Sequence, residues 1–303
     1  MAKPLQTWSG DILADRRADY ADMLFASGDN AAAAEVMLGA LELAPEWSFG
    51  WFRLGEFCEA AGDLAGAVSA WRTAQKLDPA DRAGARLKLE LAGADPASGS
   101  APGAFVEALF DQYAEKFDHA LVETLSYRVP DLLAVAIAEQ GRGWFPHAVD
   151  LGCGTGLMGE RLRPVTERLE GFDISAEMLR KARAKTIYDR LEKADLQAMV
   201  WDGPAVDLVT AADVFMYVGE LDRVTALAAS MLSRCGLFGF SVERHDGPDD
   251  LVLRPSRRYA HGEQYLRRVV AGHGFDLLSL STATIRRDRG APIEGLIVVA
   301  EKA

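Results

Sequence analysis

The segment 149–156, Val-Asp-Leu-Gly-Cys-Gly-Thr-Gly, constrains the fold of this chain more than any other. A short apolar run ends there in an acid and three alternating glycines, and helix-compatible residues follow from Leu157. This order is typical of a buried strand that leads through a tight turn into a helix, and glycines without Cβ atoms let the backbone approach a ligand closely. A second acid, Asp173, ends the next strand-like run 21 residues after Gly152. Because a carboxylate at that spacing binds ribose hydroxyls, the sequence predicts a site for a ligand that carries a nucleoside.

The spacing of the glycines favours a nucleoside ligand without a pyrophosphate. Gly152, Gly154 and Gly156 are spaced G-x-G-x-G, whereas a nicotinamide-dinucleotide site uses G-x-G-x-x-G. Leu157 stands where the last glycine of that motif belongs, and the Gly-Lys-Ser/Thr of a P-loop is absent. A ligand with a ribose and an amino-acid tail therefore fits better than a dinucleotide, and a nicotinamide-dependent oxidoreductase is the disfavoured alternative.

The chain from residue 105 onward alternates between helical and strand periodicity. Strands are predicted at 147–151, 168–173, about 197–201, 207–212, 236–242, 277–285 and 295–301, and helices at 157–163, 175–189, 220–233 and 262–272. This order predicts an α/β fold, a doubly wound and mostly parallel seven-stranded sheet with helices on both faces. The turn-rich segment 289–292 joins the last two strands, so they are expected to form an antiparallel hairpin.

Residues 14–92 contain an internal repeat with a period of 34 residues. The second copy places small, aromatic and turn residues at Trp51, Leu54, Gly55, Cys58, Gly62, Ala67, Trp71, Ala74 and Pro79, and the first copy, at Arg17, Tyr20, Ala21, Leu24, Gly28, Ala33, Met37, Ala40 and Pro45, is more degenerate. The segment resembles two tetratricopeptide repeats followed by a capping helix at 82–92. The resemblance implies a groove for a peptide or protein partner. Two repeats are few, however, and an interpretation in which they only pack on the second domain stays open.

The composition of the chain divides it into two domains. Residues 94–104 are small, polar and rich in Pro and Gly, as in a connector that buries little surface. We therefore predict an all-α repeat domain at 1–93, a linker at 94–104 and an α/β domain at 105–303.

Charge and cysteine usage exclude several classes of function. The net charge of −12 disfavours a nucleic-acid partner, since phosphate binding needs clustered Lys and Arg. Cys58, Cys153 and Cys235 are too few and too far apart for a disulfide framework or a zinc site, and no metal is predicted. The N-terminus lacks the apolar core of a secretion signal and no apolar run reaches membrane-spanning length, so a cytoplasmic protein with no membrane partner is expected.

Four segments within 105–303 resemble the motifs of class I S-adenosylmethionine-dependent methyltransferases of the type 11/12 kind. They are 149–156, 171–179, 195–196 and 207–218, in the order and spacing of that family. The resemblance implies S-adenosyl-L-methionine as cofactor and S-adenosyl-L-homocysteine as product. The tandem of repeats and methyltransferase is similar to a bacterial group of predicted repeat-containing methyltransferases. The cofactor-binding residues that the resemblance implies are Asp150, Gly152, Cys153, Gly154, Asp173, Ile174, Met178, Asp195, Leu196, Asp213, Tyr113 and Phe117.

The same resemblance implies a role for each group. The glycine backbone contacts the methionine part of the cofactor and Asp173 binds the ribose hydroxyls. Ile174 and Met178 flank the adenine, and the pair at 195–196 reads the adenine edge. Tyr113 and Phe117 lie in a segment, 110–118, that resembles the lid helix of the small-molecule branch of the family. The alternative for these two aromatics is a place in the core of an amphipathic helix.

The sequence identifies the catalytic residues less clearly than the cofactor-binding ones. A sulfonium-bound methyl group is intrinsically electrophilic, so a general base is optional. Candidates lie at the predicted ends of the fourth and fifth strands, where an open α/β sheet places its ligands, and they are Asp213, Tyr217, Glu243 and His245. The alternative for each is a solvated loop residue.

Two further groups near the predicted substrate side have open interpretations. The basic run Arg254, Arg257 and Arg258 is either a solvated loop face or a site that attracts a carboxylate. His261, between two tyrosines, is a candidate for the substrate entrance. The function predicted from the sequence is methyl transfer to a small-molecule or protein acceptor. The alternative is a non-catalytic scaffold that binds S-adenosylmethionine or S-adenosylhomocysteine and docks a protein partner through its repeats.

Overall fold

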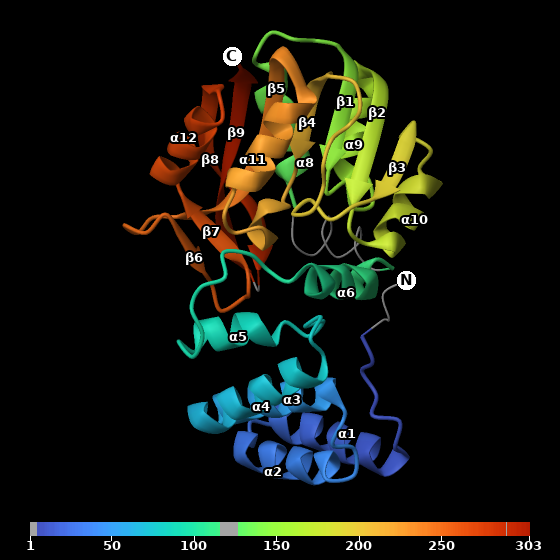
Figure 1. Ribbon diagram of the computed structural model, residues 1–303, viewed down its shortest axis with the longest axis vertical. Coiled ribbons are helices and arrows are strands. Elements are labelled where there is room, and N and C mark those ends of the chain that lie inside the picture. The colour runs from blue at the N-terminus through green and yellow to red at the C-terminus, as the bar shows by residue number, and fades with distance from the viewer. Residues whose placement is uncertain (1–4, 116–126, 289) are drawn as a thin grey trace. The chain divides into compact units, whose positions relative to one another are not determined.

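The computed structural model describes residues 5–115, 127–288 and 290–303. The chain divides into two compact units, Met1–Ala108 and Leu109–Ala303. In its described residues the first unit is built of helices, and the second unit is an α/β structure that contains the glycine turn (Figure 1). The helix α6 begins at Gly103, inside the segment predicted as a linker.

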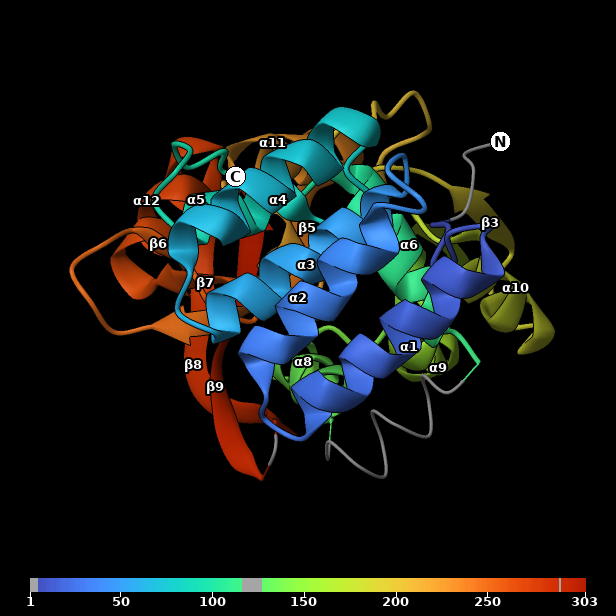
Figure 2. The ribbon, with the colours of Figure 1, turned by 90° about the horizontal axis from the view of Figure 1, so that it is seen from below.

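The helices of the first unit follow one another as antiparallel hairpins. Figure 2 shows α1, α2, α3 and α4 side by side in chain order. The helices described in the first unit are α1 (Ile12–Ala26), α2 (Asn30–Leu41), α3 (Ser48–Ala60), α4 (Leu64–Leu77) and α5 (Ala85–Leu91), and α6 (Gly103–Tyr113) begins in the first unit and ends in the second.

A Gly-Asp pair recurs at the two hairpin turns of this unit, 34 residues apart. Gly28 and Gly62 adopt φ values of +88° and +84°, which glycine reaches without strain. The aspartate after each glycine caps the next helix, Asp29 by accepting a hydrogen bond from the N–H of residue 32 and Asp63 from that of residue 66. The sequence period is therefore a period of helix–turn–helix structure. The assignment of these hairpins to the tetratricopeptide family remains a prediction.

Small residues let α3 and α4 pack closely. A Cβ atom on Gly55 would lie 2.2 Å from Nε1 of Trp71, whose side chain is fully buried. Because an interior is packed at close to crystal density, the helices meet at this distance only where the side chain is missing.

The second unit is built on one nine-stranded sheet, in which β3-β2-β1-β4-β5 are neighbours and parallel (Figure 1). Its antiparallel end consists of β9, which pairs with β5 and with β8. The prediction of a mostly parallel sheet with an antiparallel C-terminal hairpin is confirmed. The elements are α8 (Val129–Ala138), β1 (Phe145–Leu151), α9 (Leu157–Leu162), the 3₁₀ helix η2 (Arg163–Val165), β2 (Thr166–Asp173), α10 (Ala176–Ala184), β3 (Arg190–Lys193), β4 (Val206–Ala211), the 3₁₀ helix η3 (Phe215–Tyr217), α11 (Asp222–Met231), β5 (Leu232–His245), β6 (Leu251–Leu253), β7 (Tyr259–Gly262), α12 (Glu263–Gly272), β8 (Phe275–Asp288) and β9 (Ala291–Lys302).

The third strand lies earlier in the chain than predicted. The expected strand at 197–201 is wrong, and β3 is formed by Arg-Leu-Glu-Lys at 190–193, which pairs with β2. As an edge strand rich in charged side chains it has no apolar alternation for the sequence to display. The apolar residue Trp201 instead packs edge-on against Phe172 from a loop, with 6.0 Å between ring centroids. The preceding helix also ends at Ala184, short of 189, and Thr186 takes a positive φ of +54°.

Two short strands absent from the prediction raise the number of strands from seven to nine. They are β6 and β7, which pair as an antiparallel hairpin. The turn between them contains the basic run at 254–258, which was interpreted as a loop face or an anion site. β7 pairs with β5 only at 243–245, beyond the residues of β5 that pair with β4. The hairpin therefore extends the sheet at its carboxyl edge, just past the end of β4.

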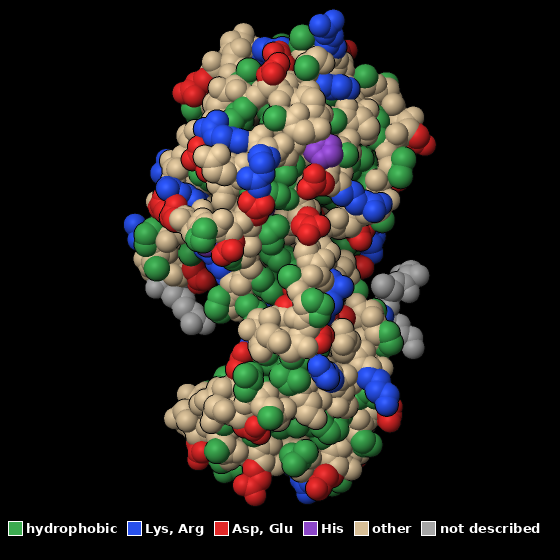
Figure 3. Space-filling view, turned by 60° about the vertical axis from the view of Figure 1, so that its left-hand side comes forward, with side chains coloured by type: hydrophobic (Ala, Val, Ile, Leu, Met, Phe, Trp, Pro, Cys, Tyr) green, Lys and Arg blue, Asp and Glu red, His purple; other side chains and the backbone are tan. Residues whose placement is uncertain are grey.

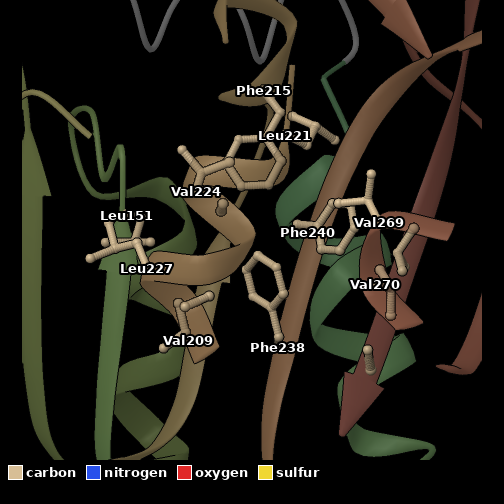
Figure 4. Packing of buried hydrophobic residues seen from close by; sticks show 14 of the residues in the cluster. Leu151, Val209, Phe215, Leu221, Val224, Leu227, Phe238, Phe240, Val269 and Val270 are labelled. Atoms are coloured by element: carbon tan, nitrogen blue, oxygen red, sulfur yellow. The ribbon is translucent and has the colours of Figure 1, made fainter. Parts of the chain in front are cut away.

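Helices cover both faces of this sheet, with α11 and α12 on one face and α8 and α9 on the other (Figure 1). Figure 4 shows the first of these cores, where Phe238 and Phe240 of β5 point toward Phe215. The centroids of the Phe238 and Phe240 rings are 4.7 Å apart, and those of Phe215 and Phe240 are 5.4 Å apart. Each such ring removed from water stabilises the fold by about 1.5–3 kcal/mol relative to an exposed one. The core thus fixes the segment after β4, which the functional site uses.

Charged side chains of both signs are spread over the face of the molecule that Figure 3 shows. None of the described helices combines the length and the apolar character that crossing a membrane requires.

Candidate functional site

Backbone conformation and close packing both favour glycine in the turn between β1 and α9. Gly152, Gly154 and Gly156 have φ values of +65°, +54° and +94°, all in the left-handed region that favours glycine. A Cβ atom on Gly152 would lie 2.4 Å from Cγ2 of Val214, the residue that precedes η3. The N–H of Cys153 donates to the carbonyl of Phe172 at 3.0 Å, which ties the turn to β2.

Asp173, the last residue of β2, is fixed to the glycine turn before any ligand binds. Its Oδ2 accepts from the N–H of Gly154 and its Oδ1 from the N–H of Ser175, both at 2.8 Å. A carboxylate offers about four lone-pair sites, so each oxygen keeps one for a further donor. The side chain is 8% exposed, and burial raises the pKa of Asp173 to about 6.

A second carboxylate, that of Asp111 on α6, is hydrogen-bonded to the start of α10. The hydroxyl of Ser175 caps α10 by accepting from the N–H of Met178 at 3.1 Å, and it donates to Oδ1 of Asp111 at 2.5 Å. Asp111 lies in the segment predicted as a lid, but the sequence did not single it out. Only the folded chain shows that α6 is linked to the start of α10 through this hydroxyl.

Asp150 in β1 has a structural role that its motif did not reveal. Its Oδ2 accepts from the hydroxyl of Tyr188 at 2.7 Å, and its Oδ1 accepts from that of Thr210 at 2.9 Å. The side chain is 1% exposed, and burial raises the pKa of Asp150 to about 6. The carboxyl therefore joins β1, β4 and the chain after α10, and its predicted contact with the cofactor stays a prediction.

Of the residues predicted to surround the adenine, Ile174 follows β2, Met178 lies in the first turn of α10, and the pair at 195–196 follows β3. Met178 and Leu196 are buried, and Ile174 is half-buried. Asp195 lies in a turn, where its Oδ1 accepts from the N–H of Gln197 at 2.9 Å. These positions leave the predicted adenine contacts as proposals.

Of the other predicted cofactor-binding side chains, Tyr113 is exposed and Cys153 is buried. Tyr113, at the end of α6, is 55% exposed, and Phe117 lies outside the described residues. Closure of the two aromatics over a cofactor therefore stays a prediction. The Cys153 side chain is buried, and burial raises the pKa of its thiol well above the ordinary value. It is a neutral thiol in the wall of the turn.

Two of the candidate catalytic residues share one buried arginine. Nη1 of Arg286, on β8, donates to Oδ1 and Oδ2 of Asp213 at 2.9 and 3.0 Å, and its Nη2 donates to Glu243. Glu243 also accepts from Nη1 of Arg254 at 3.0 Å. Asp213 has a φ of +59°, and its N–H donates to the hydroxyl of Ser241. Both carboxylates are thus ion-paired, and a catalytic role for either one stays a prediction.

The other two candidates differ from each other. The hydroxyl of Tyr217, on η3, accepts from Nε of Arg258 at 3.2 Å, and its ring meets Phe110 edge-on with 5.4 Å between centroids. His245, the last residue of β5, is half-buried, and its Nε2 has no hydrogen-bond partner among the described residues. Catalytic roles for Tyr217 and His245 stay predictions.

His261 does not line an entrance, which corrects the sequence-based interpretation. It is fully buried in β7, and its Nε2 lies 2.6 Å from the carbonyl oxygen of Gly219. Burial lowers the pKa of His261 to about 4. A neutral ring donating to a backbone carbonyl has a structural role in attaching β7 to the segment after η3.

Sequence comparisons find methyltransferases that are similar to part of this chain. Residues 148–236 match a family model described as a methyltransferase domain. The chain is 26% identical over 185 residues to an indolepyruvate C-methyltransferase of Streptomyces griseus, covering 57% of this chain and 52% of that protein. It is 26% identical over 150 residues to a ubiquinone biosynthesis O-methyltransferase of Salmonella arizonae, covering 48% and 60%. The chain thus spans between half and three-fifths of the length of these curated relatives.

A solved structure shares the fold of the second unit. Magnesium protoporphyrin IX methyltransferase from Synechocystis PCC 6803, crystallised with bound SAM, superposes with a TM-score of 0.51 at 18% identity, over 66% of this chain and 97% of that one. The second unit therefore has the fold of this methyltransferase, and residues 148–236 within it match the methyltransferase-domain model. The described part of the chain contains no group of three His, Cys, Asp or Glu side chains that could hold a metal ion.

Proposed function

We propose that this chain transfers a methyl group from S-adenosyl-L-methionine to a small-molecule or protein acceptor. The observation that carries the proposal is the anchoring of Asp173 to the glycine turn through the N–H of Gly154. The turn has no room for a Cβ at Gly152, and the carboxylate keeps free lone pairs for two hydroxyl donors. These features fit a ribose with an amino-acid tail.

The bound cofactor would supply an electrophilic methyl group, and the residues of the chain would bind and orient the reactants. Gly152 and Gly154 would hold the methionine part, and Asp173 the ribose hydroxyls. The Phe110–Tyr217 aromatic pair would help to exclude water. Orientation and exclusion of water lower a barrier by about 7–11 kcal/mol in favourable cases. Because Asp213 and Glu243 are ion-paired, we expect the acceptor to arrive as a ready nucleophile or to lose its proton to solvent.

Calorimetric titration of the full chain tests the binding step. S-adenosylmethionine and S-adenosylhomocysteine should both bind with one site per chain, and NADH should give no heat beyond dilution. Absence of binding by either adenosyl compound at high protein concentration would overturn the proposal. Binding of NADH alone would favour an oxidoreductase instead.

A pH titration provides a second, independent expectation. The folded-state pKa of Asp173 is raised to about 6 by burial, with nearby Asp111 adding repulsion, so the carboxylate form is lost as the pH falls through 6. S-adenosylhomocysteine should therefore bind about tenfold more weakly at pH 5 than at pH 7. Calorimetry across pH 5–8 measures this slope. Asp173→Asn should flatten the profile; an unchanged slope in that variant would assign the titration to another group, such as Asp150.

The alternative function is a non-catalytic scaffold, and one feature of the first unit supports it. That unit has a cavity of about 310 Å³, whose lining includes Trp8, Asp19, Asp22, Trp47, Phe49 and Arg53. A cavity lined by aromatic and charged side chains suits a protein partner. Incubation with tritiated S-adenosylmethionine and cell-extract fractions distinguishes the two functions. Label in an acceptor, absent with Asp173→Ala, supports catalysis, and cofactor binding without any labelled acceptor favours the scaffold.

A further inference from the structure

Arg258 is placed at the carboxyl edge of the sheet by the turn between β6 and β7. Its carbonyl accepts from the N–H of Arg254 at 2.8 Å, which closes the turn. Two residues later, Ala260 pairs with Glu243 of β5. Arg258 therefore stands just past the end of β4, beside η3, on the side of the sheet where class I domains bind their ligands.

The guanidinium of Arg258 has a neutral partner where its neighbours have carboxylates. Its Nε donates to the hydroxyl of Tyr217 at 3.2 Å, and its Cζ lies 6.0 Å from the centroid of the same ring. The side chain is half-buried, and none of the residues in the described ranges forms an ion pair with it. Its two terminal nitrogens have no hydrogen-bond partner among those residues.

Two other arginines at this edge are paired with carboxylates. Arg286 pairs with Asp213 and with Glu243, and Arg254 pairs with Glu243. Two guanidiniums thus face two carboxylates. Asp213 also attracts Arg258 without forming an ion pair with it. Arg258 thus adds one positive charge that has no ion-pair partner of its own among the described residues, and keeping a half-buried charge without such a partner is costly.

We propose that Arg258 and Tyr217 bind a carboxylate group of the methyl acceptor. A guanidinium presents two parallel N–H groups that match a carboxylate, and the phenol, which accepts from Nε, keeps its own hydrogen to donate. One unmatched positive charge fits a monoanion. Phe110 packs on the same tyrosine and offers an apolar wall, so the acceptor is a small organic acid with an apolar body. This inference rests on the proposed methyltransferase function, because it names the substrate class of that site.

Matched acids and amides test the inference by binding rather than by turnover. The probes are phenylacetate against phenylacetamide and 4-hydroxybenzoate against 4-hydroxybenzamide, measured by ligand-observed NMR on the full chain with and without S-adenosylhomocysteine. The acids should bind at least about tenfold more tightly than their amides, because a hydrogen-bonded charge pair is lost in the amide. In Arg258→Gln this ratio should fall to within about threefold, and Arg258→Lys should keep part of it.

Arg234→Gln is the matched control, since Arg234 is exposed near the amino end of β5 and the variant loses the same charge. The control should keep the preference for acids, and neither variant should change the affinity for S-adenosylhomocysteine. Equal binding of acids and amides by the unmodified chain overturns the inference, as does a preference that survives Arg258→Gln. If inorganic phosphate competed more strongly than either acid, the site would be one for a phosphate group and the carboxylate assignment would be wrong. Failure of S-adenosylhomocysteine to bind would instead tell against the proposed function, while the comparison without it still decides the anion site.

Discussion

Replacing Asp173 by alanine is expected to weaken the binding of S-adenosylhomocysteine by at least about 100-fold. The substitution removes a charged acceptor from two ribose hydroxyls, and each hydrogen bond to a charged group is worth about 1.5–3 kcal/mol. It also releases the N–H of Gly154, so the glycine turn loses its anchor to β2. Asp173→Asn, which keeps one carbonyl oxygen, should give an intermediate loss. Calorimetry measures the affinity of the unmodified chain and of the two folded variants.

Asp207→Asn provides the matched control for this experiment. Asp207 also accepts a backbone hydrogen bond, from the N–H of His147 at 3.1 Å, but it lies at the start of β4, on the opposite edge of the sheet. Its replacement should leave the affinity within about twofold, a free-energy change of roughly 0.4 kcal/mol. If folded Asp173→Ala bound the ligand as well as the unmodified chain does, the ribose assignment would be wrong.

Replacing Arg286 by methionine is expected to destabilise the second unit by about 3–5 kcal/mol, because it leaves two buried carboxylates without their shared counter-charge. Arg286 is 2% exposed and joins β8 to Asp213 and to Glu243 of β5. Such a loss is a large part of the stability of an ordinary domain.

Arg287→Met is the control for this prediction, since Arg287 is the next residue of β8, is exposed and donates only to the carbonyl of Gly290 among the residues described. Its effect should stay within about 0.5 kcal/mol. The two-unit chain calls for a local measurement, namely hydrogen exchange in urea of peptides from β1 and β5. The triple variant that adds Asp213→Asn and Glu243→Gln should recover part of the lost stability. If Arg286→Met alone were as stable as its control, the buried ion pairs would have no net role.

Patterns that are local in the chain predicted the central part of the second unit well. The segment 147–151 is apolar and continuous, as expected of a strand covered on both faces, and β1 is Phe145–Leu151. The hairpin of β8 and β9 was also predicted, because its turn residues and its two apolar runs are adjacent in the chain. The turns at Gly28 and Gly62 were predicted as well, because the repeat places a turn residue next to the helix that follows it, and the structure adds the aspartate cap after each glycine.

Patterns that depend on distant partners were missed. β3 is a strand because β2 offers it an edge, and its own residues carry mostly charge. β6 and β7 exist because β5 runs on past the end of β4 and leaves unpaired backbone groups there. Backbone groups that need partners form such strands even where the side chains give no periodic signal.

In the candidate site, too, local patterns were informative and distant contacts were missed. Residue type and spacing predicted the cofactor side, and in the structure Asp173 accepts a hydrogen bond from the N–H of Gly154 in the glycine turn. Its contact with the cofactor stays a prediction. On the acceptor side the sequence placed Asp213 and Glu243 at the correct edge of the sheet but gave no sign of Arg286, which is 43 residues further along than Glu243. Arg258 was visible only as part of a basic run with two interpretations.

The sequence by itself determined the glycine turn, the acid that follows it and the order of most strands, because each depends on neighbours in the chain and on periodic burial. Only the tertiary structure decided which carboxylates are already paired, which arginine is left with an unmatched charge, and which polar groups link α6 to α10. The physical reason is that desolvation and Coulomb energy depend on distance in space, and residues far apart in sequence become neighbours only when the sheet and its covering helices are assembled.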